Sequence, residues 1–152
     1  MRRVAVTGMG IVSPIGNTTQ EATASLREAK SGISFSGQYK DMGFKSQVMG
    51  APQIDLDAAI DRRAKRFMGD TAAYAFIAMD QALRDSGLEE KDVVNPRTGL
   101  IVGSGGPSVK ALITAADITR ENKSPKRIGP FAVPKAMSST CSAVLSLSLI
   151  HI

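Results

Sequence analysis

Residues 70–86 form the stretch of sequence that most constrains the fold of this chain. Asp70 is placed to cap the start of a helix, and Gly87 is placed to end it. The apolar residues inside this helix are Ala72, Ala73, Phe76, Ile77, Met79, Ala82 and Leu83. Because they fall nearly all round the helix rather than on one stripe, the helix must be packed on several sides. The sequence therefore predicts a helix inside a layered fold.

Two short apolar runs flank this helix along the chain. Val4–Thr7 leads into Gly8-Met9-Gly10, and Thr98–Gly103 leads into Ser104-Gly105-Gly106-Pro107. Each run predicts a buried strand followed by a tight turn, and a short extended piece also fits residues 46–49. With helices between the strands, the order of elements predicts an α/β layered fold whose sheet is mixed or parallel.

Further helices are predicted on both sides of residues 70–86. Thr18 and Glu21 form a capping box at the start of one helix, and Ser31-Gly32 ends it. Its apolar side is formed by Ala22, Leu26 and Ala29. A second helix is expected from about Ser108 to Arg120. A last helix is expected to begin near Pro134, because proline suits the first helical turn.

The composition limits the classes of function. A chain of 152 residues, 43% hydrophobic and 22% charged, is long enough for one domain with a real core. The net charge of +5 is mild, and two tyrosines and five phenylalanines offer few stacking platforms, so nucleic acid is not an expected partner. One cysteine excludes a disulfide framework. No long apolar run or signal-peptide core is present, so we expect a cytoplasmic protein with no membrane contact.

The segment 61–70 carries the densest charge in the sequence. It places four cations within the five positions 62–66. At 3.6 residues per turn, Arg62, Arg63 and Arg66 share one helical face, with Lys65 on its flank. Such a face raises the local concentration of anions and predicts a docking patch for an acidic partner. The alternative is an ordinary solvated helix face.

Two glycine-rich segments have weaker interpretations. Gly8-Met9-Gly10 begins a partial dinucleotide fingerprint, but Ser13 replaces the third glycine and the helix begins only at Thr18. A pyrophosphate would then lack its helix N-terminus, so nicotinamide binding is a remote alternative. Gly103–Gly106 lacks the Lys-Ser/Thr of a nucleotide P-loop. Its glycines either let a ligand approach the backbone or form a plain turn.

Neither the cysteine nor the histidine is predicted to be catalytic. Cys141 falls inside a predicted helical run, residues 137–143, where a small buried residue is the commoner case. His151 lies in Leu147–Ile152, which resembles the translation of a common sequencing-library adapter joined to a broken reading frame. We therefore expect the natural domain to span residues 1–146 and the last six residues to be non-native.

Several stretches together resemble the opening of a β-ketoacyl-acyl carrier protein synthase. They are Val6–Asn17, Ser25–Glu28, Ser31–Ile33, Asp61–Met68, Gly103–Gly106, Gly129–Phe131 and Lys135–Met137. Within that family the likeness is to the type I enzymes of bacterial fatty acid synthesis. The match runs in order from residue 1 to about residue 146 and covers only the first part of a much longer enzyme.

The resemblance implies a thiolase-like fold and a homodimer. It also implies a decarboxylative Claisen condensation of an acyl thioester with malonyl-acyl carrier protein. That reaction requires an activated cysteine, an oxyanion hole and two histidines. In the family these groups lie downstream of the region matched here. The resemblance therefore transfers no catalytic residue, metal ligand or cofactor to this chain, and we expect the chain to be inactive alone.

The resemblance does transfer a surface for acyl carrier protein. Arg62, Arg63 and Arg66 match family positions that contact the acidic recognition helix of the carrier. A second basic patch is matched by Arg120, Lys123 and Lys126. Lys65 departs from the apolar residue that is usual in the family, and Gly106 matches a position near the acyl pocket. A free-standing carrier-binding module is the alternative to an enzyme fragment.

Overall fold

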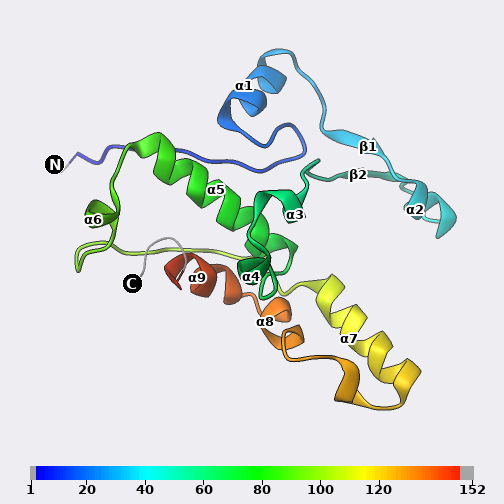
Figure 1. Cartoon of the computed structure of the whole chain (residues 1–152). Helices are drawn as coiled ribbons and strands as arrows, with labels where there is room; N and C mark the ends of the chain where they lie inside the picture. Colours follow the sequence, from blue (N-terminus) through cyan, green and yellow to red (C-terminus); the bar gives the residue numbers. More distant parts are fainter. Residues whose placement is uncertain (1–2, 148–152) are drawn as a thin grey trace.

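A computed structural model of the chain describes residues 3–147, apart from the side chain of Glu90. Helix α5 (Asp70–Ser86) lies at its centre (Figure 1) and has the bounds that the sequence predicts. Gly87 ends it in the left-handed conformation, with φ 66°. Asp70 does not cap it, because Gly69 occupies the N-cap position and Asp70 is the first helical residue.

The core lies between α5 and α9 (Thr140–Leu145), which pack together. Its buried members are Ile60, Met68, Ala72, Ala73, Cys141 and Val144. Small residues on α5 bring the two helices close, since Ala72 and Ala73 are only 4% and 1% exposed. Most of the other apolar side chains of α5 are only partly buried. The helix is therefore packed on fewer sides than its composition predicts.

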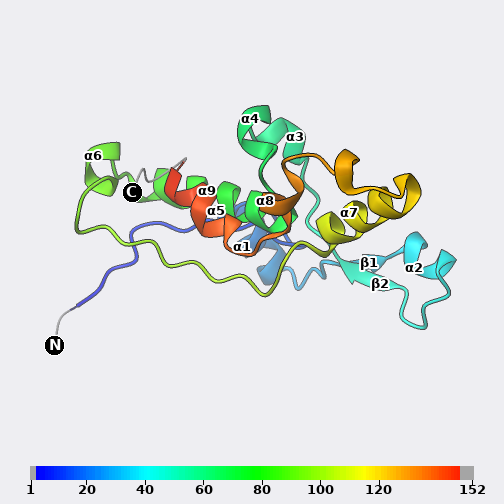
Figure 2. The ribbon, with the colours of Figure 1, turned by 90° about the horizontal axis from the view of Figure 1, so that it is seen from below.

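The two apolar runs predicted as strands are extended, but they are not strands. Residues 98–103 run alongside α5, whereas residues 4–7 extend past its C-terminal end (Figures 1 and 2). The two runs do not pair with each other or with any other described strand. A strand needs another backbone about 4.8 Å away to form its ladder, and none of the described residues provides one. Val4 and Ile101 are accordingly 94% and 98% exposed.

The sheet that the structure does contain is antiparallel. Strand β1 (Ile33–Phe35) pairs with β2 (Val48–Gly50) in a register that places Ile33 opposite Gly50. Helix α2 (Gly37–Asp41) connects them and is capped by the buried Ser36, whose hydroxyl accepts a hydrogen bond from Tyr39 N–H. A short extended piece near 46–49 is thus confirmed. A parallel or mixed sheet is not formed among residues 3–147.

Helix α1 (Thr19–Arg27) begins where the sequence predicts and ends earlier. Thr18 accepts from Glu21 N–H, but the Glu21 carboxylate accepts from Asn17 N–H and not from Thr18, so the capping box is only partly formed. The predicted apolar side is wrong at Leu26, which is 71% exposed. Ser25 is buried instead, because its hydroxyl donates to Ile15 C=O at 2.6 Å.

The remaining helices follow the order of the sequence. They are α3 (Leu56–Ala59), α4 (Arg62–Lys65), α6 (Glu90–Val93), α7 (Val109–Asn122), the 3₁₀ turn η1 (Pro125–Arg127) and α8 (Ala132–Ala136). Helix α7 confirms the predicted helix and continues two residues past Arg120. The prediction of a single last helix beginning near Pro134 is wrong, because α8 ends at Ala136 and α9 starts at Thr140.

None of the helices within residues 3–147 is both long and apolar enough to cross a membrane. The expected domain boundary at Ser146 falls next to the end of the described region. Residues 148–152, which include His151 and most of the expected non-native tail, lie outside the described residues.

Candidate functional site

A groove of about 700 Å³ opens between α4, the start of α5, α7 and α8. Its apolar lining comes from Met68, Ala111, Ala115, Ile118, Ile128 and Phe131. Its charged lining comes from Arg62, Lys65, Arg66, Lys110, Lys135, Asp57 and Asp70. Five basic side chains against two acidic ones make the groove a place where an anion is favoured over a cation.

The cations of α4 are presented by a very short helix. The carboxylate of Asp61 starts it by accepting from Arg63 N–H at 2.8 Å and from Ala64 N–H at 3.4 Å. The helix spans only four residues, and Arg66 follows as its C-cap. Arg62 and Arg66 line the groove, whereas Arg63 is exposed but does not line it. The predicted common face is therefore divided.

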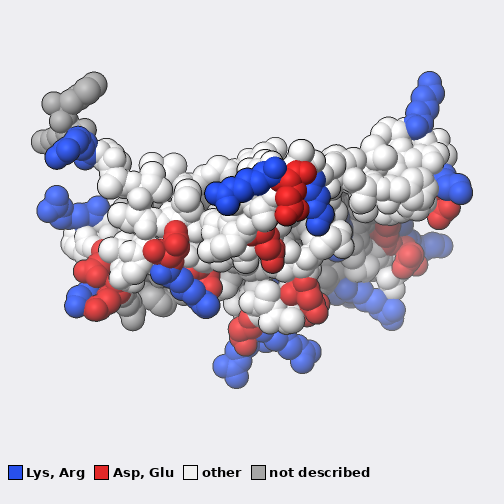
Figure 3. Space-filling model, turned by 90° about the horizontal axis from the view of Figure 1, so that it is seen from above, with Lys and Arg blue, Asp and Glu red and all other residues white. Residues whose placement is uncertain are grey.

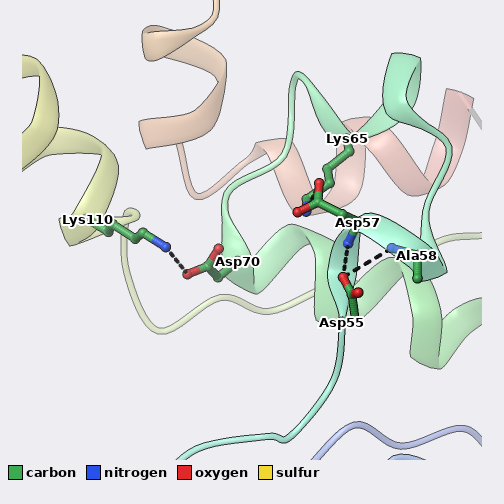
Figure 4. A network of polar contacts seen from close by, with 6 residues as sticks. All are labelled: Asp55, Asp57, Ala58, Lys65, Asp70 and Lys110. Atoms are coloured by element: carbon green, nitrogen blue, oxygen red, sulfur yellow. Dashed lines mark hydrogen bonds and ion pairs between the residues drawn. The ribbon is translucent and has the colours of Figure 1, made fainter.

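Two ion pairs lie along this groove (Figure 4). Lys65 Nζ is 2.6 Å from a carboxylate oxygen of Asp57, and Lys110 Nζ is 3.5 Å from one of Asp70. Asp57 belongs to α3, which Asp55 caps by accepting from the Asp57 and Ala58 N–H groups. Among the described side chains, no carboxylate pairs with the remaining basic residues of the groove, Arg62, Arg66 and Lys135. These three remain to receive an external anion.

The second predicted basic cluster lies at the other end of α7. Arg120 pairs with Asp117 at 3.0 Å on the same helix. Lys123 ends α7 with a left-handed φ of 48°, and Lys126 follows in η1. All three cations are exposed, and none lines the groove. Figures 1 and 2 place α4 and this end of α7 apart, so the chain by itself does not join the two clusters.

The surface is mixed in charge and not uniformly positive. On the face drawn in Figure 3, basic and acidic side chains lie among one another. An anionic partner would therefore be selected by where the unpaired cations lie more than by overall potential.

Gly106 and Cys141 line a second, very small cavity of about 10 Å³. Ser104 lies there too, its hydroxyl donating to Gly106 C=O at 3.0 Å. The space is close to that of one water molecule. Cys141 is 3% exposed and belongs to the core, in agreement with its predicted structural role. The assignment of Gly106 to an acyl pocket stays a prediction.

The glycines of the partial dinucleotide fingerprint serve the packing of the chain. A Cβ on Gly8 would lie 2.1 Å from Ala82 C=O, and one on Gly10 would lie 1.9 Å from Ala78 C=O. These glycines therefore face the backbone of α5 and leave no space there for a pyrophosphate. The packing argues against the nicotinamide alternative.

Several residues of the groove were not predicted from the sequence to belong to a site. They are Lys110, Lys135, Phe131, Asp57 and Asp70. They come from α3, α5, α7 and the two ends of α8, and apart from Asp70 none belongs to a local charge pattern. Only their assembly in space makes them one site. Among residues 3–147, no group of three or more His, Cys, Asp or Glu is arranged to hold a metal ion.

Comparison with known proteins identifies the family of this chain. The family described as "Beta-ketoacyl synthase, N-terminal domain" matches residues 1–150. The chain is 49% identical over 147 residues to 3-oxoacyl-[acyl-carrier-protein] synthase 1 of Escherichia coli (strain K12). That alignment covers 96% of this chain and 36% of the relative, so the chain spans about a third of the length of the curated relatives it matches.

Solved structures agree with the sequence comparison. The ishigamide ketosynthase/chain length factor matches with a TM-score of 0.85 and 26% identity, over 97% of this chain and 37% of that chain. A β-ketoacyl synthase from Burkholderia phymatum STM815 matches with a TM-score of 0.77 and 27% identity, over 97% of this chain and 36% of that chain. The predicted thiolase-like α/β fold class is confirmed as an incomplete portion of that fold.

Proposed function

Because the chain belongs to the β-ketoacyl synthase family, we propose that it forms part of the surface on which a condensing enzyme receives acyl carrier protein. The observation that carries this proposal is the groove whose cations Arg62, Arg66 and Lys135 have no acidic partner among the described side chains. An acidic protein helix is an anion of suitable size for such a site. Charges at the rim of an interface mainly set the rate of encounter and its dependence on salt.

The whole enzyme would carry out a decarboxylative Claisen condensation. An acyl group passes from its carrier to a cysteine thiolate, and the thiol of that carrier is released. Malonyl on a second carrier then loses carbon dioxide, and the resulting carbanion attacks the acyl-enzyme carbonyl and expels the cysteine thiolate. The core position of Cys141 does not suit it to be that nucleophile, because a reactive thiolate must be accessible. We assign carrier docking to this chain and the chemistry to the whole enzyme.

The proposal includes the homodimer and the compartment that the sequence suggests. Helix α7 exposes Val109, Leu112 and Ile113, which are 62%, 47% and 55% exposed. These apolar side chains support an interface with a second subunit. In such a dimer, Arg120, Lys123 and Lys126 of one subunit would be able to reach a carrier bound in the groove of the other. The free, buried Cys141 supports a reducing compartment such as the cytoplasm.

Charge reversal of the three predicted carrier-contacting arginines, of which Arg62 and Arg66 line the groove, tests the docking surface. The variant R62E/R63E/R66E is titrated with acyl carrier protein at low and at physiological salt. We expect binding to weaken at least about tenfold at low salt, because unpaired cations become anions facing an acidic helix. The matched control is K30E/K40E/K45E, which makes the same change in net charge at exposed positions outside the groove.

The outcome separates local docking from general attraction. Equal weakening in the two triple variants would mean that only net charge matters, and it would contradict the proposed site. The variant R120E/K123E/K126E then measures the second cluster in the same way. For this cluster we expect carrier binding to weaken only in a dimeric protein, because the cluster lies apart from the groove within one chain.

A stand-alone carrier-binding module remains the second candidate function. It is favoured by the continuous core between α5 and α9, which the chain forms from its own residues. A cooperative thermal transition together with salt-dependent carrier binding would support the module. Turnover of acyl and malonyl thioesters by the 152-residue chain would contradict both candidates, since neither places the catalytic groups in it.

A further inference from the structure

Arg66 makes an aromatic contact that distinguishes it from the other cations of its segment. Its guanidinium carbon Cζ lies over the ring of Phe131, 5.6 Å from the ring centroid. The ring of Phe67 meets Phe131 edge-on, with centroids 5.1 Å apart and planes at 89°. The contact joins the end of α4 to the turn before α8, on the two sides of the groove.

This contact differs in kind from the ion pair of Lys65. An aromatic face attracts a cation within about 6 Å of its centroid, but it offers no oxygen that would occupy the guanidinium N–H groups. Those donors remain available for a carboxylate, which arginine can bind with two parallel hydrogen bonds. Lys65, in contrast, is engaged by Asp57 at 2.6 Å. Arg66 is therefore held without being neutralised.

We propose that Phe131 is a positioning residue, whose ring holds the Arg66 guanidinium at the mouth of the groove in readiness for a carboxylate of an acidic partner. Phe67 supports the ring edge-on and so limits its orientation. A long side chain that is already ordered loses less conformational entropy when the partner binds. This inference rests on the proposed function, because it assigns Phe131 a role in the same docking site.

Arg63 provides a comparison within the same short helix. It is exposed, lies three residues before Arg66, and has no aromatic partner among the described side chains. Its guanidinium must be ordered by the partner itself when that partner binds. The loss of Phe131 should therefore affect the contribution of Arg66 and leave that of Arg63 unchanged.

A double-mutant cycle with acyl carrier protein as the probe tests the positioning role. F131L removes the aromatic face and keeps an apolar side chain. F131Y is a separate variant that keeps the ring. We expect F131L to weaken carrier binding about two- to fivefold, and F131Y to bind like the wild type. In the R66Q background, F131L should cause no further loss. The matched control is F44L, which removes an aromatic ring from the connection between β1 and β2, outside the groove.

Nuclear magnetic resonance gives a second readout that needs no partner, and its main comparison is made within the unmodified chain. A ring current shifts protons above an aromatic face upfield. We expect the Cδ protons of Arg66 to resonate upfield of those of Arg63, and the difference to disappear in F131L. Equal shifts for the two arginines in the unmodified chain would overturn the inference. That result does not depend on whether F131L folds.

The two proposals fail in different ways. If R66Q weakens binding but F131L does not, the docking site stands and the positioning role is wrong. If F131L weakens binding equally with and without Arg66, the effect comes from general packing and the positioning role is again wrong. If R66Q leaves binding unchanged, the proposed docking at Arg66 is wrong, and Phe131 cannot have a positioning role in it.

Discussion

Two extended segments run alongside α5, and they use glycine in opposite ways. In the first, Gly8 and Gly10 press against the backbone of α5, where an added Cβ would lie 2.1 and 1.9 Å from a carbonyl oxygen. In the second, Gly103, Gly105 and Gly106 have nothing within 4 Å of such an atom. The same residue type thus allows close packing in one segment and an open turn in the other.

Polar contacts reinforce the difference between the segments. Met9 N–H donates to the Asp85 carboxylate at 2.9 Å, and Ile11 N–H donates to the Gln81 side chain at 3.1 Å. The amide of Gln81 in turn donates to Asn17 C=O at 2.7 Å. No side chain of α5 makes a comparable hydrogen bond to described residues 98–103. The first segment is therefore fixed to α5 by hydrogen bonds, whereas the second packs its partly buried Val102 against the core.

The largest effect is expected for Gly10→Ala. Its Cβ would meet the backbone carbonyl of Ala78 at 1.9 Å, and a backbone atom cannot swing away as a side chain can. We expect the free energy of unfolding to fall by about 3 kcal/mol or more. Urea denaturation followed by circular dichroism measures it. A fall of less than about 1 kcal/mol would mean that the first segment is not packed on α5 as described.

A smaller loss is expected for Gln81→Met, which preserves the length of the side chain and removes both of its hydrogen bonds. Ile11 N–H and Asn17 C=O would lose their partners in a partly buried place, which costs about 2 kcal/mol. Gln81→Glu is the matched variant, because it keeps the acceptor for Ile11 and removes only the donor to Asn17. Its unfolding midpoint should lie between those of the wild type and Gln81→Met. Identical midpoints for all three proteins would contradict the claim that Gln81 fixes the first segment to α5.

The smallest effect, and one of opposite sign, is expected for Gly105→Ala. Gly105 has open space around its Cα, and its φ is not in the left-handed region that disfavours other residues. Alanine there restricts the unfolded chain without a clash, so stability should rise by about 0.5 kcal/mol. A thermal melt beside that of Gly10→Ala measures the contrast directly. Destabilisation by Gly105→Ala would indicate that the second segment is packed in solution.

Local signals in the sequence explain which parts of the fold were predictable. The bounds of α5 depend on an apolar run and on Gly87, and both act within a few residues. The start of α7 depends on Ser108, which accepts a hydrogen bond from Ala111 N–H. The predicted strands at 4–7 and 98–103 failed because a ladder depends on a second backbone, which an apolar pattern cannot supply by itself.

The candidate site was also predictable only in part. The cations of segment 61–70 were visible as a run of charges, and their match to carrier-contacting positions of the family came from resemblance. The ion pair that engages Lys65 was not visible, because Asp57 belongs to another helix. Nor was the ring beneath Arg66, since Phe131 lies more than sixty residues further along the chain.

By itself, the amino-acid sequence determined the family, the main helices and the presence of two basic clusters, because composition, caps and motif order are properties of neighbouring residues. The tertiary structure alone decided which cations are left without an acidic partner, which glycines are packed against a helix, and which ring lies under Arg66. These outcomes depend on distances between segments that are remote in the chain. Charge and packing act through space, and only the folded backbone sets those distances.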